Sequence, residues 1–158
     1  MAIQVGGTTV IDNSRNITVQ NATLTNYGSI RALFETGNVV ATAANANVQI
    51  DIATNAIQYF TSNAANNTTL NFRGNATASL NSIMNTGNTV TSAVIITNGS
   101  TAYYPTVYQV DGAAVTPKWQ NGTAPSAGNA SATDIYTLTI VKTGSAAFTV
   151  FGSQTKFA

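Results

Sequence analysis

The chain has 158 residues, of which 44% are hydrophobic, so it is long enough for one domain with a core and too short for two. Only 7% of its residues are charged, against roughly 25% in an average soluble protein, and the net charge is +1. Cysteine and histidine are both absent. Their absence excludes disulfide bonds, thiolate or imidazole metal sites, a cysteine nucleophile and a Ser-His-Asp triad.

Threonine and asparagine take the place of the missing charged residues. The sequence holds 26 Thr, 19 Asn and 24 Ala but only five Leu. β-Branched residues favour strands and asparagine favours turns, whereas long helix-forming side chains are scarce. The composition therefore excludes an all-helical protein and favours β structure.

The six basic residues are spread singly along the chain, at Arg15, Arg31, Arg73, Lys118, Lys142 and Lys156. This spacing gives no basic stripe that could neutralise a run of phosphates, so we expect no nucleic-acid partner. The longest apolar run is residues 93–96, and the first residues do not combine a basic region with an apolar stretch. We therefore expect synthesis in the cytoplasm and no insertion into a membrane.

The first 46 residues differ from the rest of the chain. Between residues 3 and 24, apolar residues recur in short alternating pieces separated by turn-forming residues, which is typical of brief strands. Residues 27–35 suit a short helix stopped by Gly37 and Asn38, or equally a strand, and residues 41–47 are small and polar. We interpret residues 1–46 as an arm and linker, and residues 47–158 as the folded domain. Apolar residues that could anchor the arm are Val5, Val10, Ile11, Ile17 and Val19.

Regular strand patterns begin at residue 48. They occupy residues 48–52, 57–59, 70–72, 90–96, 104–110, 135–141 and 148–151, with Val115 as a further short piece, and each is closed by an Asn, Gly or Pro cluster. Seven or eight short strands at this spacing predict a sandwich or barrel. We predict an all-β, antiparallel β-sandwich, jelly-roll-like, with an extended N-terminal arm and at most one or two short helices.

Turn and helix signals complete this prediction. Asp111-Gly112 suits a tight hairpin, because both central positions of that turn need a positive φ, and residues 142–145 suit a second hairpin. Residues 79–87 predict a helix that is capped by Ser79 and lies across an open end of the sandwich. Similar Asn/Thr-rich pieces begin at residues 21, 67 and 75, but their uneven spacing does not support a repeat solenoid.

Five acidic residues are the only possible acid-base groups, namely Asp12, Glu35, Asp51, Asp111 and Asp134. A pair of carboxylates about 5 to 10 Å apart would suit glycoside hydrolysis. No spacing in the sequence joins two of them, and turn or surface positions explain each one. We therefore expect no catalytic residue, no metal ligand and no cofactor.

Aromatic residues gather in the second half of the chain, at Tyr103, Tyr104, Tyr108 and Trp119. Tyrosine and tryptophan combine a large apolar face with a polar tip, so this cluster could form a stacking platform for a glycan or an anchor in an interface. Packing in the core and hairpins is the alternative, because Tyr104 and Tyr108 have the same parity along one strand.

Several segments resemble virion structural proteins. Residues 5–17 (VGGTTVIDNSRNI) resemble strand-turn segments of tail-fibre and other virion proteins of marine tailed phages, particularly those that infect cyanobacteria. The pieces AYYP, VDG, VTPKWQ, GTAP, GNAS and QTKFA, in this order between residues 102 and 158, are similar to the C-terminal β-sandwich of those proteins. The resemblance implies a non-enzymatic virion component, commonly homotrimeric, and it implies no catalytic residue.

The chain departs from typical fibres because no long shaft lies between the arm and the sandwich. We therefore expect a capsid-decoration protein or short knob on the exterior of the virion, made in the host cytoplasm. An arm without its own core needs a partner surface to offset roughly 1–2 kcal/mol per residue of ordering entropy. We expect neighbouring copies of the chain, or the major capsid or tail proteins of the virion, to supply that surface. The alternative is a tail-fibre-tip module that recognises a host surface glycan.

Overall fold

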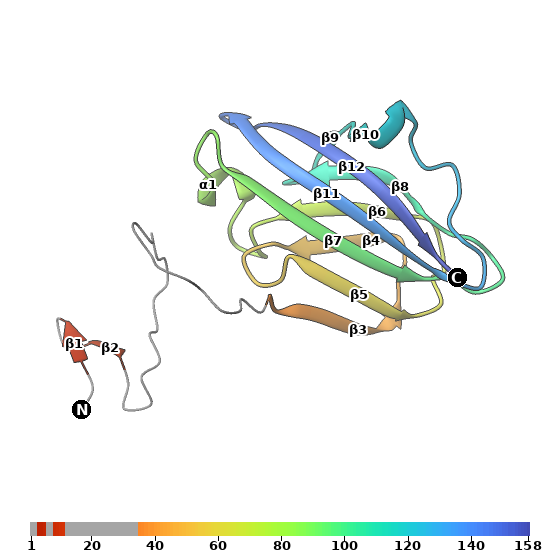
Figure 1. Cartoon of the computed structure of the whole chain (residues 1–158). Coiled ribbons are helices and arrows are strands. Elements are labelled where there is room, and N and C mark those ends of the chain that lie inside the picture. The colour runs from red at the N-terminus through yellow and green to blue at the C-terminus, as the bar shows by residue number, and fades with distance from the viewer. Residues whose placement is uncertain (1–2, 6–7, 12–34) are drawn as a thin grey trace. The chain divides into compact units, whose positions relative to one another are not determined.

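The computed structural model describes residues 3–5, 8–11 and 35–158, and the chain divides into two compact units, Met1–Leu33 and Phe34–Ala158 (Figure 1). In the first unit, β1 (Ile3–Val5) and β2 (Thr8–Ile11) form an antiparallel hairpin. The predicted anchors Val5, Val10 and Ile11 lie on this hairpin. Ile17 and Val19, like residues 27–34, lie outside the described residues.

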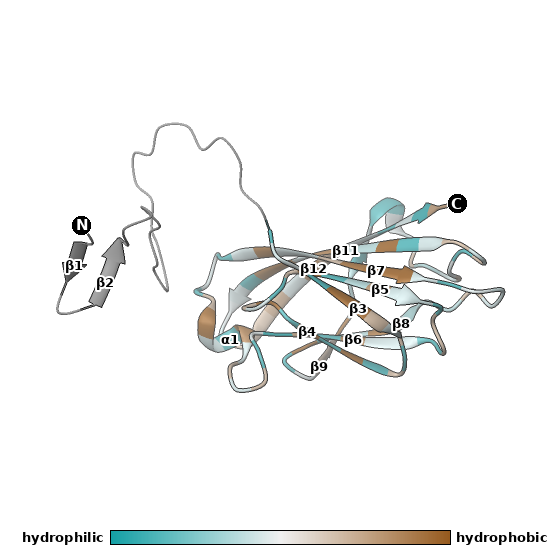
Figure 2. Ribbon diagram, turned by 90° about the horizontal axis from the view of Figure 1, so that it is seen from below, coloured by the Kyte–Doolittle hydropathy of each residue, from teal (hydrophilic) through white to brown (hydrophobic). Residues whose placement is uncertain are grey.

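The second unit is a sandwich of two β-sheets, as the sequence predicts (Figure 2). The six-stranded sheet has the order β10-β12-β11-β7-β5-β3, and the four-stranded sheet has the order β4-β6-β8-β9. The strands of the first sheet are β3 (Gly37–Ala43), β5 (Ile57–Ser62), β7 (Thr89–Thr97), β10 (Lys118–Trp119), β11 (Thr133–Gly144) and β12 (Ala147–Phe157). Those of the second are β4 (Asn47–Asp51), β6 (Thr68–Arg73), β8 (Pro105–Val110) and β9 (Ala113–Val115).

Successive strands from β3 to β8 alternate between the two sheets. Strand β5 pairs in parallel with β3 and β7, and β6 pairs in parallel with β4 and β8. After one strand in the other sheet, the chain returns to its first sheet and runs again in its original direction. This half of the chain therefore forms a flattened coil. Antiparallel pairing joins β8 with β9, and β11 with β7 and β12. The predicted antiparallel arrangement is therefore wrong for the coil, and the jelly-roll-like connectivity is not confirmed.

The sandwich begins earlier than residue 47. Strand β3 pairs with β5, and the compact unit starts at Phe34, so the predicted boundary after residue 46 is wrong. Gly37 and Asn38 open a strand instead of ending a helix, and residues 41–47 include the end of β3 and the start of β4. Small side chains in this segment serve packing, because Ala44 is completely buried where the chain crosses from one sheet to the other.

Alternate residues of each strand point into the space between the sheets and form the core. The longest strand, β11, shows this alternation along ten consecutive residues. Full burial of each large apolar side chain contributes about 1.5–3 kcal/mol, so this layer dominates the stability of the sandwich. The completely or almost completely buried large apolar residues include Ile50, Leu70, Phe72, Ile96, Tyr136, Leu138 and Ile140.

A single helical turn, α1 (Leu80–Ile83), lies at one end of the sandwich (Figure 1). The Ser79 hydroxyl accepts a hydrogen bond from the backbone N–H of Ser82, which confirms the predicted cap. The helix is shorter than the predicted residues 79–87 because the backbone becomes extended at Met84. A 3-10 turn, η1 (Gln120–Gly122), follows β10, so the described residues contain two short helical elements.

Asp111 connects the β8–β9 hairpin to this helix. Asp111 and Gly112 have φ angles of 52° and 80°, as the predicted hairpin turn requires. The two carboxylate oxygens of Asp111 accept hydrogen bonds from the backbone N–H groups of Leu80 at 2.7 Å and Asn81 at 2.9 Å. These are first-turn donors that have no partner within a helix, so a residue about 30 positions away caps α1. The second hairpin turns at residues 144–147, slightly later than predicted.

Replacing Asp111 with alanine is expected to lower the free energy of unfolding by about 2–3 kcal/mol, because two backbone donors lose a charged acceptor. Asp111→Asn, which suits the turn and keeps one acceptor oxygen, should lose less. Chemical denaturation measures both. The control is Asp51→Ala, which removes a partly exposed ion pair worth about 0–1 kcal/mol. An Asp111→Ala loss no larger than the control would contradict the capping role.

Candidate functional site

Three of the four predicted aromatic residues meet in one groove. The groove lies where the edge strands β9 and β10 leave the sandwich open, and its volume is about 320 Å³. All three prolines of the chain line it as well. We call this site the aromatic groove, and its principal lining residues are Tyr104, Tyr108, Trp119, Pro105, Pro117 and Pro125.

Trp119 closes the core at this edge of the sandwich. Strand β10 runs parallel to β12 and places Trp119 opposite Gly152. A Cβ atom at position 152 would lie 2.7 Å from Cζ3 of the indole, so the ring approaches the backbone as only glycine allows. The ring of Tyr108 meets the indole edge-on, with centroids 5.2 Å apart. Trp119 therefore packs against Gly152 and Tyr108 and also borders the groove.

Tyr108 forms the floor of the groove and does not offer its hydroxyl to a ligand. Its side chain is 7% exposed, and the hydroxyl donates to the carbonyl oxygen of Pro105 at 3.1 Å. Burial raises the pKa of Tyr108 well above its ordinary value, with a smaller contribution from Tyr104. Tyr108 therefore packs in the core, which the sequence analysis gave as the alternative to ligand binding. Tyr104 and Trp119 remain partly exposed.

Tyr103 lies apart from the groove. It packs against the core as a partly buried residue and does not line the groove with its neighbour Tyr104. Adjacent residues in an extended segment point in opposite directions, which separates the two tyrosines. The predicted four-residue cluster is therefore three residues in the structure.

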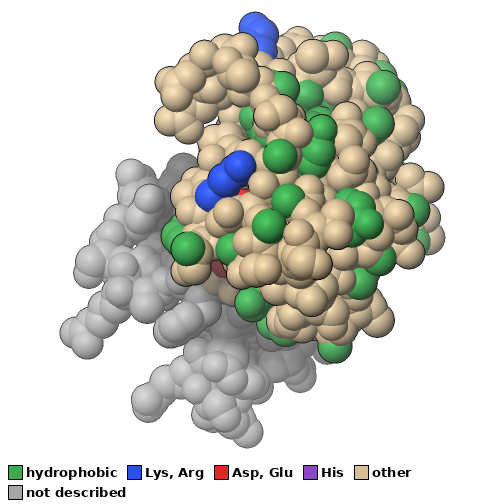
Figure 3. Space-filling model, turned by 90° about the vertical axis from the view of Figure 1, so that its right-hand side faces the viewer, with side chains coloured by type: hydrophobic (Ala, Val, Ile, Leu, Met, Phe, Trp, Pro, Cys, Tyr) green, Lys and Arg blue, Asp and Glu red, His purple; other side chains and the backbone are tan. Residues whose placement is uncertain are grey.

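The lining of the groove suits apolar rings. None of its lining residues is charged, and the polar groups of these residues are hydroxyls, the indole N–H of Trp119 and backbone atoms. Tyr104, Trp119 and Pro125 are partly exposed and present apolar ring surfaces that can stack against the apolar face of a sugar, whereas Pro105 and Pro117 are buried. The end of the sandwich near the C-terminus is equally poor in charge, since charged side chains cover only a small part of the surface in Figure 3.

The outward side of the six-stranded sheet is a second candidate site, which we call the uncharged face. Its residues on β3, β5, β7, β11 and β12 are Val39, Ile57, Tyr59, Thr61, Thr89, Thr91, Ala93, Ile95, Thr97, Thr133, Ile135, Thr137, Thr139, Val141, Thr149, Phe151, Ser153, Thr155 and Phe157. None is charged. Lys118 lies at the margin on β10, with its ammonium 5.8 Å from the centre of the Phe151 ring. No described helix or loop crosses this face in Figure 1.

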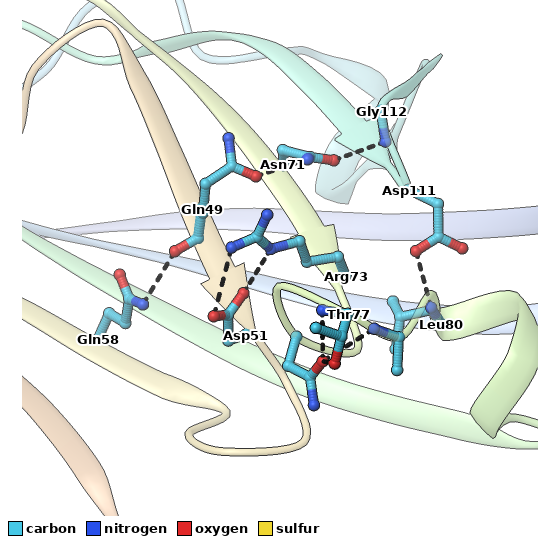
Figure 4. Close-up of polar contacts among 11 residues, drawn as sticks. Gln49, Asp51, Gln58, Asn71, Arg73, Thr77, Leu80, Asp111 and Gly112 are labelled. Carbon is cyan, nitrogen blue, oxygen red and sulfur yellow. Dashed lines mark hydrogen bonds and ion pairs between the residues drawn. The ribbon is translucent and has the colours of Figure 1, made fainter.

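The outward side of the four-stranded sheet is different, because several of its polar side chains bond to one another (Figure 4). The amide of Asn71 donates to the side-chain oxygen of Gln49 at 2.7 Å and accepts from the backbone N–H of Gly112 at 2.9 Å. Arg73 and Asp51 form an ion pair at 2.6 Å. This face therefore carries a network of polar side-chain contacts, whereas the uncharged face has no comparable network among the described residues.

The acidic residues are dispersed among different partners. Asp51 pairs with Arg73, Asp111 caps α1, and Glu35 is exposed. The fully buried carboxylate of Asp134 accepts hydrogen bonds from the side-chain amide of Asn98 at 3.1 Å and the backbone N–H of Asn129 at 2.8 Å. Asp12 lies outside the described residues. Among the described residues, no three His, Cys, Asp or Glu side chains gather as metal ligands would.

Two of these features were not found by sequence reasoning. The capping role of Asp111 has no local signal, because the helix lies about 30 residues earlier in the chain. The uncharged face does have a local signal in the sequence, since threonines alternate with buried residues in both β7 and β11. Threonine at every second position of a strand indicates a common outward face.

Comparison with known proteins gives no match: no protein-family model, curated protein or solved structure is similar to this chain. Among the described residues, no helix has the length and apolar character needed to cross a membrane.

Raising the pH above about 10 is expected to destabilise the sandwich, because Tyr108 and Tyr136 remain neutral in it. A tyrosine in the unfolded chain ionises near pH 10, whereas burial raises the pKa of both residues above that value, with Asp134 adding to the effect on Tyr136. Below about pH 10 the stabilisation is complete; above it, stability falls by about 1.4 kcal/mol per pH unit for each tyrosine.

Urea unfolding between about pH 9 and pH 11 measures this loss. Tyr136→Phe removes one titrating group, so the variant should show a shallower fall than the wild type. Equal slopes for the two proteins would contradict the role of Tyr136.

Proposed function

We propose that the protein is a non-enzymatic structural component on the exterior of a tailed-phage virion, a capsid-decoration protein or short knob. In this proposal its N-terminal arm anchors it to major capsid or tail proteins, and it assembles as a homotrimer. The observation that carries the proposal is the uncharged face of the six-stranded sheet. The resemblance of residues 5–17 and of the segments between residues 102 and 158 to phage virion proteins points to the same class.

An uncharged sheet face suits a protein that works in close contact with others. Moving an ionised side chain out of water carries a penalty of several kcal/mol unless it is paired, whereas a hydroxyl that finds a hydrogen bond loses little. Threonine hydroxyls form hydrogen bonds with water before assembly, and they allow the face to be buried afterwards. The same property extends to the whole chain, since only 7% of its residues are charged.

The N-terminal hairpin supports an anchoring role. Strands β1 and β2 contain three and four residues, and they belong to a unit separate from the sandwich. Two short strands alone are marginally stable in water, so a hairpin of this size gains most from a partner surface or a third strand. Val5, Val10 and Ile11 are the apolar residues that this hairpin would bring to a neighbouring virion protein.

Deleting residues 1–26 is expected to abolish incorporation into particles while leaving a folded sandwich, because the described core lies between Ala44 and Val150. Quantifying the protein in purified virions measures incorporation, and circular dichroism of the truncated protein reports its fold. Full occupancy of particles by the folded truncated protein would show that the arm is not the anchor.

A second function is favoured by the aromatic groove. Tyr104, Trp119 and Pro125 present partly exposed rings in a hollow without charged lining residues, which fits the apolar face of a host surface glycan. In this alternative the protein is a receptor-binding module at a fibre tip. Tyr108 would support the groove from below through its contact with Trp119.

Tyr104→Ala is expected to weaken binding to host cells or lipopolysaccharide by about tenfold or more, because a stacked ring contributes on the order of 1–3 kcal/mol. Tyr103→Ala is the matched control, since Tyr103 is the adjacent residue of the same type and does not line the groove. Binding of labelled full-length protein to cells gives both affinities. Undetectable binding by the wild type, or equal losses in the two variants, would refute this alternative.

A further inference from the structure

Four apolar side chains form a continuous row across the uncharged face. Val39 pairs with Tyr59, Tyr59 with Ile95, and Ile95 with Ile135, so the four residues lie side by side on neighbouring strands. Adjacent strands are about 4.8 Å apart, which brings these side chains into contact along the row. We call this feature the apolar row.

The apolar row ends at an open edge of the sheet. Strand β3 is the last strand of the six, and its side chains are largely exposed, Val39 by 70%. Proteins commonly protect such edges with lysine, proline or an inward charge. Strand β3 has none of these residues, so within the described part of the chain neither the apolar row nor the edge beside it carries such protection.

We propose that a second copy of this chain covers the apolar row, with copies meeting through their uncharged faces around a symmetry axis. This inference rests on the proposed assembly function and names the surface that carries it. Ile95 and Ile135, at the middle of the sheet, lie closest to the centre of the contact.

Electrostatics favours a second copy over a different partner. Close to a symmetry axis a side chain lies beside its own copy, so a charge at the centre of the contact would meet a like charge. The uncharged face presents no such charge within its five strands, and Lys118 stands at its margin. A strongly charged partner would find nothing there to pair with, whereas an identical face offers matching apolar and hydroxyl groups. The net charge of +1 adds little repulsion between whole copies.

The size of the face is sufficient for a specific contact. Five strands about 4.8 Å apart, with an outward stretch of about 26 Å along β7, give a flat area of roughly 600 Å². Side chains make the accessible area larger than the flat area, and a standard interface buries about 800 Å² per partner. A contact that covers this face and reaches the β3 edge therefore buries an area within the normal range of specific protein–protein interfaces.

The test is the mass of the full-length protein in solution, measured by sedimentation equilibrium. The wild type is expected to form an oligomer, and Ile135→Lys should be monomeric at the same concentration because it places like charges at the centre of the contact. Ile135→Thr keeps a β-branched residue and should weaken association at least tenfold. Val107→Lys is the matched control, because Val107 is 41% exposed on the outward side of the four-stranded sheet.

A monomeric wild type would overturn the inference, as would Ile135→Lys or Ile135→Thr variants that keep the wild-type mass and affinity. Dissociation by Val107→Lys alone would place the contact on the other sheet and also refute it. Thermal melts confirm that each variant is folded, and if Ile135→Lys does not fold, Ile135→Thr decides. Incorporation into virions is measured separately, so an oligomer that is missing from particles refutes the proposed function and leaves this inference standing.

Discussion

Parallel pairing between strands that lie one turn of the coil apart is the constraint on which the sandwich depends. It aligns Val48 with Leu70 in one sheet and Val39 with Tyr59 in the other. Side-chain hydrogen bonds follow the same alignment, joining residues 21 or 22 positions apart in the first turn. The second turn contains α1, and the equivalent contact of Tyr104 with Asn67 spans 37 positions. Because the turns are unequal, the coil leaves no regular period in the sequence.

The coil also explains why the two outward faces differ. In parallel strands, residues one turn apart stand side by side, so Gln49 meets Asn71 and Asp51 meets Arg73. These pairs connect part of the four-stranded face internally. The six-stranded face instead receives threonine and apolar residues, joined by a hydroxyl contact between Thr91 and Thr139 at 3.1 Å. The two outward faces therefore differ both in charge and in the polar contacts between their side chains.

The aromatic groove shows how the core and a candidate binding surface share residues. Trp119 seals the core over Gly152 and also borders the groove, so a change at this position affects both. The sequence identified Tyr104, Tyr108 and Trp119 because large amphipathic rings are recognisable by type alone. It could not separate Tyr103 from them or place Tyr108 at the floor, because those distinctions depend on tertiary packing: Tyr103 packs against the core, and Tyr108 contacts Trp119 across the two sheets.

The sequence by itself determined the all-β class, the positions of most strands, the Asp111-Gly112 turn and the Ser79 cap, because each depends on neighbouring residues. Only the tertiary structure decided the direction of pairing, the inclusion of β3 in the sandwich and the capping of α1 by Asp111. The alternation of apolar and polar residues along a strand indicates which residues face the core. This alternation is the same whether the neighbouring strands are parallel or antiparallel. The choice between them was made by the burial of segments far apart in the chain, which also gathered the uncharged residues on one sheet.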